Sequence, residues 1–267
     1  MTAIAVEGTR RQAAPIRSVP MSRLAGVELR KMFDTRSGFW LMASIAATAV
    51  IATGAVILYA PDEELTYASF GSAVGFPTAV ILPMAAILSV TSEWSQRSGL
   101  TTFTLVPHRG RVVLAKAVAA IGIGVASMLL AMAIGAIGNV VGTAITGTPT
   151  VWDVSLADAA HIVLGNVLGL MGGFAIGVLL RSSAAALVAY FVISFVQPTL
   201  LMLLASRQAG FQDLQPWVDV NAAQSALFTI GSPVTGQEWA QLAVTEAVWL
   251  VLPLVVGLRL VLRSEIK

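Results

Sequence analysis

The chain has 267 residues, of which 57% are hydrophobic and only 11% are charged, and its net charge is +2. Soluble domains carry about 25% charged residues, so this composition excludes a water-soluble enzyme and a disordered chain. The sequence contains no cysteine, which excludes disulfides, thiolate metal sites and cysteine nucleophiles. Long apolar runs separated by short polar loops indicate an all-α membrane protein, because the strands of a membrane β-barrel would alternate over about 10 residues each.

The first 36 residues are predicted to lie outside the membrane core. Residues 1–20 carry three arginines without a helical pattern, which predicts a flexible cytoplasmic tail. Residues 21–36 are predicted to form an amphipathic helix in the cytoplasmic interface, with basic side chains toward the lipid headgroups. Its apolar face would consist of Met21, Ala25, Leu29, Met32 and Phe33. The alternative is a solvated basic extension of the first membrane helix.

Six apolar runs are predicted to cross the membrane as helices, because each approaches the ~20 residues that span ~30 Å of hydrocarbon. The runs cover about 39–60, 70–90, 112–138, 162–180, 184–206 and 242–262. Together with 21–36 they form a single transmembrane domain over 21–267. Four prolines inside the runs are predicted to kink the helices without ending them, since neighbouring helices can satisfy the freed carbonyls. These are Pro77, Pro83, Pro198 and Pro253.

The distribution of charge predicts the orientation of the chain. Six crossings place 15 of the 16 Lys and Arg residues on one side, and only Arg207 on the other. Basic residues are retained on the cytoplasmic side of a membrane. Both termini and the loop between the second and third helices are therefore expected in the cytoplasm.

Few polar residues lie at membrane depth, where ionisable groups are costly and often mark function. Asn166 and Gln197 are predicted to form hydrogen bonds between helices. Glu246 is either a structural residue near the outer end of the sixth helix or a substrate or proton site. Residues 207–240 form a long outer connection rich in apolar side chains, which predicts a short, partly re-entrant helical element over 221–230. The candidates for a pathway or gate are Asn166, Gln197, Phe228 and Glu246.

Glycines recur at helical spacing in two of the runs. In the fourth run they form a small-residue face that allows helix backbones to approach closely, within one chain or between subunits. These glycines are Gly165, Gly169, Gly173 and Gly177. Others are expected to mark fraying near the end of the third helix, namely Gly135, Gly138 and Gly142.

No catalytic or metal-binding motif is found in the sequence. It has no GxxxxGK[ST] phosphate loop and no HExxH, and its two histidines are too few for a histidine-rich metal site. An enzyme is therefore not expected, nor a cofactor held by this chain, nor a nucleic-acid partner. Active transport would draw its energy from an ion gradient or from a partner protein.

The loop between the second and third helices carries the most specific pattern. Its residues Glu93, Arg97, Gly99, Thr101, Pro107, Arg109, Arg111 and Lys116 follow one motif. This motif resembles the same loop in type-2 ABC exporter permeases, particularly those of actinobacterial drug-export systems. Val27–Trp40 resembles the family's N-terminal elbow helix, and Leu258–Lys267 its Arg-rich C-terminus. Leu100 departs from the family pattern, which often has Thr after the Gly.

The resemblance implies an ABC transporter permease that serves export or multidrug efflux. The chain would be a multi-pass subunit of a bacterial plasma membrane, paired with a second permease subunit as a homo- or heterodimer and surrounded by membrane lipids. ATP and Mg would bind a separate ABC ATPase subunit, which docks on the loop. Coupling to that ATPase would involve Glu93, Arg97, Thr101, Pro107, Arg109 and Arg111. The elbow helix would be seated through Leu29, Arg30, Lys31 and Phe33.

Other functions remain open from the residues alone. Three plus three helices are also compatible with an ion-coupled secondary transporter or a channel. A membrane anchor for an ATPase complex has the same sequence features. The substrate is equally open among drug, lipid, peptide and polysaccharide.

Overall fold

The structure is a computed structural model, and it describes residues 19–34, 36–95 and 109–263. This part of the chain is built from helices, and its one non-helical pairing is an isolated bridge between Thr66 and Val151. The all-α prediction is confirmed. The principal helices are α1 (Met21–Asp34), α2 (Arg36–Tyr59), α3 (Tyr67–Ser95), α5 (Arg109–Thr146), α6 (Leu156–Leu180), α7 (Ser183–Phe191), α8 (Gln197–Arg207), α12 (Gly236–Glu246) and α13 (Leu252–Arg263).

Five helical stretches within the described residues are long and apolar enough to cross a membrane. They are Tyr67–Trp94, Gly110–Thr146, Leu156–Leu180, Ser183–Arg207 and Gly236–Arg263. The first predicted crossing lies in α2, whose apolar part Ala43–Tyr59 is shorter. The architecture is that of a multi-pass membrane protein, and the sixth crossing stays a prediction.

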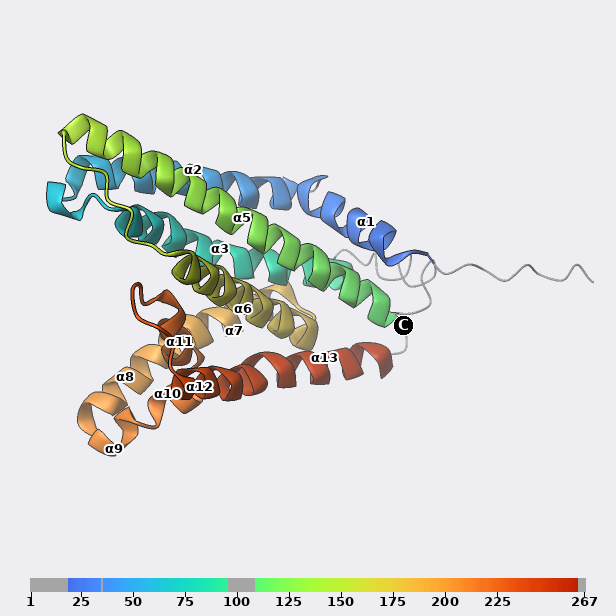
Figure 1. The fold of residues 1–267 in the computed structure, drawn as a ribbon. Helices are drawn as coiled ribbons and strands as arrows, with labels where there is room; N and C mark the ends of the chain where they lie inside the picture. Colours follow the sequence, from blue (N-terminus) through green and yellow to red (C-terminus); the bar gives the residue numbers. More distant parts are fainter. Residues whose placement is uncertain (1–18, 35, 96–108, 264–267) are drawn as a thin grey trace, which may run out of the picture.

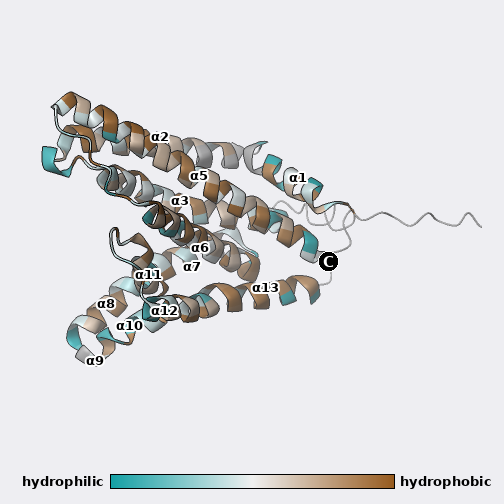
Figure 2. Ribbon diagram, viewed as in Figure 1, coloured by the Kyte–Doolittle hydropathy of each residue, from teal (hydrophilic) through white to brown (hydrophobic). Residues whose placement is uncertain are grey.

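Helix α3 lies at the centre of the bundle and packs against α2, α5 and α6, while α13 packs against α6 (Figure 1). The described chain starts in α1 and finishes in α13 at the same end of the bundle (Figure 1). Hydrophilic residues gather at the two ends and hydrophobic residues cover the length between them (Figure 2). This distribution fits a molecule whose middle lies in hydrocarbon.

The glycine face of α6 makes close contacts within the chain at Gly173 and Gly177. A Cβ on Gly173 would lie 2.8 Å from the carbonyl oxygen of Pro83, and one on Gly177 would lie 3.4 Å from the Cα of Ile87. Both contacts are with the backbone of α3, so the missing side chains allow α3 and α6 to approach closely. Pro77 and Pro83 lie inside α3, which continues past both of them.

The predicted fraying near the end of α5 is wrong. The helix continues to Thr146, beyond the predicted end at 138. Gly138 and Gly142 lie against Phe70, and a Cβ on either would come within 3 Å of that ring. These glycines accommodate a buried aromatic side chain of α3, and the helix remains regular around them.

The last two long apolar stretches each contain a π-helical turn that ends two residues before a proline. Val192–Val196 (η2) separates α7 from α8, and Ala247–Val251 (η4) separates α12 from α13. Pro198 and Pro253 are the second residues of α8 and α13. Proline lacks an N–H and its ring collides with the preceding turn, so the helix widens locally there. The predicted kinks at these two prolines therefore take the form of π turns.

Two helices begin earlier than their apolar runs. Helix α6 starts after Ser155, whose side chain forms a capping box with Asp158, and α12 starts after Thr235, which does the same with Glu238. Capping boxes satisfy backbone N–H groups that the first turn leaves unpaired. Because these first turns are polar, hydropathy alone placed the starts at 162 and 242.

Candidate functional site

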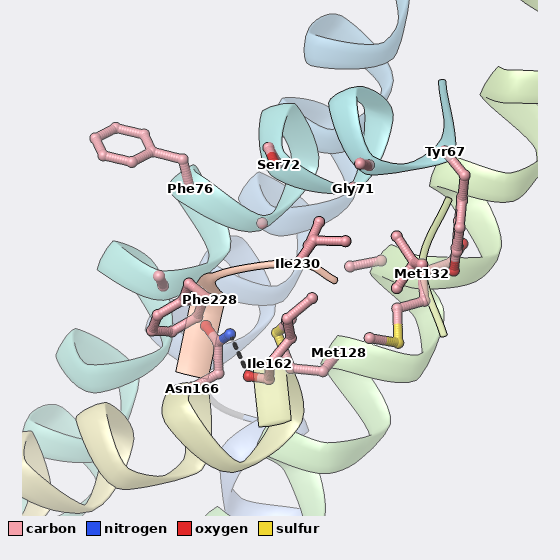
Figure 3. Close-up of a pocket in the computed structure, with 15 residues that line it drawn as sticks. Tyr67, Gly71, Ser72, Phe76, Met128, Met132, Ile162, Asn166, Phe228 and Ile230 are labelled. Carbon is pink, nitrogen blue, oxygen red and sulfur yellow. Dashed lines mark hydrogen bonds between the residues drawn. The ribbon is translucent and has the colours of Figure 1, made fainter. Parts of the chain in front are cut away.

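Two adjoining cavities lie between α3, α6 and the connection that precedes α12. Their volumes are ≈ 320 Å³ and ≈ 260 Å³, and they share Phe76, Ala79, Asn166 and Phe228 in their walls. We call them the first and the second cavity. The first is lined largely by apolar side chains from the start of α3, the middle of α5 and the start of α6 (Figure 3).

The second cavity brings polar side chains together from four elements. Asn166 comes from α6, Ser194 from η2, Asn221 and Gln224 from α11 (Val220–Gln224), and Glu246 from the end of α12. Three of the four candidate pathway residues, Asn166, Phe228 and Glu246, therefore line one cavity. Gln197 is half-buried at the start of α8 and is not among the described residues that line either cavity.

Glu246 is the acidic group of the second cavity. Its side chain is buried, with the residue only 9% exposed, and its Oε1 accepts a hydrogen bond from Nε2 of Gln224 at 2.6 Å. Within the described residues no Lys, Arg or His forms an ion pair with it. The carboxylate thus has an amide partner and no cationic one in this part of the chain.

The side chain of Asn166 forms a hydrogen bond within its own helix and not the predicted one between helices. Its Nδ2 donates to the carbonyl of Ile162 at 2.8 Å, one turn earlier in the same helix (Figure 3). Its Oδ1 is buried and has no hydrogen-bond partner among the described residues. An unpaired buried amide oxygen is costly, so the cavity wall presents an acceptor for a ligand or water.

The predicted re-entrant element is helical and folds back onto the bundle. It consists of α11 and the 3₁₀ turn η3 (Ser225–Phe228), in which Leu227 is only 1% exposed. The ring of Phe228 lies directly over Gly165, where a Cβ would come within 2.7 Å of it. The element closes one side of both cavities, and Figure 3 shows Phe228 beside Asn166.

Side chains connect this element, and the turn just before it, to the π turns. Nδ2 of Asn221 donates to the carbonyl of Ile193 at 3.2 Å. Nε1 of Trp249 donates at 2.9 Å to the carbonyl of Val218, the last residue of α10 (Gln215–Val218). In η2 the N–H of Gln197 bonds to the carbonyl of Val192. The next such bond would require an N–H from Pro198, which has none. Asn221 therefore satisfies a carbonyl that the proline leaves free.

A second buried polar cluster lies at the other end of the bundle, at the base of the loop that follows α3. Nζ of Lys116 in α5 contacts Oε2 of Glu28 in α1 at 2.5 Å and Oε1 of Glu93 in α3 at 3.1 Å. Lys31 joins the same two carboxylates at 2.8 Å and 3.4 Å. We call these four residues the loop-base cluster. It connects α1 to both helices that bound the loop.

The two lysines of the loop-base cluster differ in exposure. Lys116 is 6% exposed and also donates to the carbonyl of Ser89, whereas Lys31 is partly open to solvent. Burial would lower the pKa of Lys31, but hydrogen bonds and attraction from Glu28 and Glu93 outweigh it and raise that pKa above its usual value. The ammonium group of Lys31 is therefore charged at neutral pH.

The structure places the predicted coupling residues unevenly. Glu93 is buried in the loop-base cluster, and Arg111 donates from Nη2 to the carbonyl of Val19 at 2.7 Å. Arg109 is the first residue of α5. Arg97, Thr101 and Pro107 lie outside the described residues.

The predicted elbow helix is present as a helix in α1. Leu29 and Arg30 are exposed, Lys31 belongs to the loop-base cluster, and the side chain of Phe33 lies outside the described part. The position of α1 in a membrane interface stays a prediction.

Glu28 was missed by the sequence analysis. It lies seven residues after Met21 and four before Met32, so it shares their face of α1. An acidic residue on the apolar face of an amphipathic helix signals a buried partner. That partner, Lys116, belongs to the motif of the loop.

Searches against protein-family profiles and against curated protein sequences found no match to this chain.

Proposed function

We propose that the chain is the permease subunit of an ATP-driven ABC exporter. Two such subunits, identical or different, would form the substrate pathway in a bacterial plasma membrane and couple to separate ATPase subunits. Both termini and the loop after α3 would face the cytoplasm, with six crossings in total. The motif over 93–116 and the membrane-helical architecture support this proposal together.

The loop-base cluster is the observation that carries the proposal. A plain connector needs no buried ion pairs, which lose much of their attraction to desolvation. Here Lys116 of α5 contacts both Glu93 of α3 and Glu28 of α1. Such an anchor would let a force applied to the loop move α1, α3 and α5 together.

The cavities supply the second requirement of a permease, which is space for a ligand between helices. They lie between α3, α6 and the connection that precedes α12, and small-molecule sites are commonly formed between helices of bundles. In the proposed orientation the first cavity is nearer the outer surface. The α11–η3 element would then cover the pathway from outside.

Complex formation with an ABC ATPase tests the proposal. The chain would be co-expressed in pairs with ABC ATPases encoded beside it, purified through a tag on the permease, and assayed for bound ATPase and ATP hydrolysis. We expect a stable complex with wild type and a weakened one with Arg97→Glu. Arg23→Glu, on the exposed face of α1, serves as the matched charge reversal and should leave association intact. A chain that binds none of these ATPases contradicts the proposal.

An ion-coupled secondary transporter is a second candidate, because Glu246 is an ionisable group buried at a cavity. A proton-coupled carrier would transport in response to a pH gradient without any ATPase. In that case Glu246→Gln would abolish the response to the gradient. Transport by the purified chain alone would decide for this candidate.

A further inference from the structure

We propose that the second cavity binds an amphipathic organic cation, with the carboxylate of Glu246 facing the positive charge. This inference deepens the proposed export function by naming a substrate class, and it rests on that function only in treating the cavity as part of the pathway. Its basis is the charge, the aromatic lining and the shape of the cavity.

The charge of the cavity is the first argument. Glu246 lies in the interior of the last long apolar stretch and is nearly buried, and among the described residues its hydrogen-bond partner is the amide of Gln224. No Lys, Arg or His is among the described residues that line the cavity. Carboxylates at membrane depth are normally paired or face a water-filled cavity. The group that completes this site is therefore a cation that enters the cavity.

The aromatic lining is the second argument. Five aromatic side chains from α3, α7, η2, η3 and η4 line the second cavity, and these are Phe76, Tyr190, Phe195, Phe228 and Trp249. Ring faces attract cations, most strongly where water is excluded. Rings also accept the flat apolar body of an organic ligand. A small inorganic ion would gain nothing from such walls.

The shape of the site is the third argument. Glycines of α6, among them Gly169 and Gly172, line the second cavity, and a Cβ added to either of these two would meet no atom within 4 Å. The adjoining first cavity offers ≈ 320 Å³ of mainly apolar space. A ligand with a charged head at Glu246 would extend its apolar part past Phe228 and Asn166 into the first cavity.

The same features disfavour the other substrate classes. Anionic lipid headgroups and phosphate-linked polysaccharides would be repelled by an unneutralised carboxylate. A neutral ligand would leave the carboxylate with its amide partner Gln224 and with no cationic partner among the described residues. A role limited to proton binding would leave the aromatic walls unused, and it remains an outcome that the experiment separates.

Binding of matched probes to the purified chain tests the inference. The protein is placed in nanodiscs of zwitterionic phosphatidylcholine, and ethidium, a permanently charged aromatic cation, is titrated by fluorescence. N-phenyl-1-naphthylamine serves as a neutral aromatic probe. We expect Glu246→Gln to weaken ethidium binding by about tenfold or more, because a charge contact shielded from water is lost. The affinity for the neutral probe should change by less than about twofold.

A charge-swap variant keeps the test independent of folding defects. Glu246→Gln combined with Gln224→Glu restores one carboxylate and one amide across the same hydrogen bond, so ethidium binding should return. Glu63→Gln removes an exposed acidic charge from η1 (Asp62–Glu64), away from the cavity, and should leave binding unchanged. Should Glu246→Gln fail to fold, the swap variant and displacement of ethidium from wild type by tetraphenylphosphonium still decide the matter.

Several results would overturn the inference. Equal ethidium affinity in wild type and Glu246→Gln would assign the residue a structural or proton-binding role. An equal loss of affinity for both probes would lead to the same conclusion. A charge-swap variant that folds but does not regain ethidium binding would also do so. Because no ATPase takes part, a chain that forms the ATPase complex but binds no ethidium refutes only this inference. Charge-dependent binding without any ATPase complex refutes only the proposed function.

Discussion

At the scale of single residues, two buried polar clusters mark the two ends of the membrane domain. Glu28, Glu93 and Lys116 lie together at one end, and Glu246 with Gln224 lies in the cavity toward the other. Glu93, Lys116 and Glu246 stand out in the sequence, because charge is rare in it. Their partners were not predictable, since hydropathy carries no information on which helices meet.

Removal of Lys116 is expected to destabilise the protein strongly. Lys116→Met removes the buried cation of the cluster and leaves the partly exposed Lys31 facing Glu28 and Glu93, and breaking a buried pair from one side costs about 3–5 kcal/mol. Thermal unfolding in detergent should show a clear loss relative to Arg30→Met, which removes an exposed charge from α1. A Glu28→Gln, Lys116→Met double variant should lose less than the sum of the two single changes. Equal unfolding temperatures of Lys116→Met and Arg30→Met would show that the loop-base cluster contributes nothing to stability.

At the scale of elements, hydropathy predicted the long apolar helices and left their ends uncertain. The apolar runs located each helix, but the capping boxes at Ser155 and Thr235 place two starts in polar sequence. Pro198 and Pro253 signalled local distortion, but the form of that distortion, a π turn, depends on how the backbone relaxes around a missing N–H. Kinks at Pro77 and Pro83 stay a prediction. Asn166 bonds within its own helix, because its Nδ2 reaches the carbonyl of Ile162 one turn away.

The contact between α3 and α6 is expected to tolerate no side chain at Gly173. In Gly173→Ala the new Cβ would press against the backbone carbonyl of Pro83 at 2.8 Å, so the helices must separate. Overpacking of this kind costs about 1–3 kcal/mol. Gly169→Ala, four residues earlier with nothing within 4 Å, is the matched control and should leave the unfolding temperature unchanged or higher. A comparable loss at both positions would argue against the close contact.

The α11–η3 element should protect its inner face from solvent. In the cysteine-free chain, Leu227→Cys replaces a residue that is 1% exposed, and Leu214→Cys replaces one that is 50% exposed. An impermeant maleimide should therefore label position 214 quickly and position 227 slowly in intact cells. Equally fast labelling at both positions would show that the element stands free of α6.

At the scale of the whole molecule, the helical bundle agrees with the predicted topology in one respect. The described chain starts and finishes at the same end (Figure 1), as an even number of crossings requires. Charge bias gave this expectation directly from the sequence, because nearly all basic residues fall on one side. The cavities were not predictable, since they depend on how α6, the π turns and the α11–η3 element meet.

Single cysteines should report the orientation. An impermeant thiol reagent applied to intact cells should label Glu63→Cys and Asp213→Cys, which are exposed at the predicted outer side. It should not label Arg23→Cys or Arg263→Cys until the membrane is made permeable. Labelling of the last two in intact cells would reverse the orientation and place the loop after α3 outside.

The central claim is that ATP hydrolysis by a partner drives transport through this chain. The most direct measurement is uptake of ethidium into proteoliposomes that contain the permease and its ATPase facing outward, without any ion gradient. We predict accumulation that requires ATP, stops when the phosphate-loop Lys of the ATPase is replaced, and weakens in Glu246→Gln. Accumulation driven by a pH gradient in the absence of both ATP and the ATPase would contradict the account.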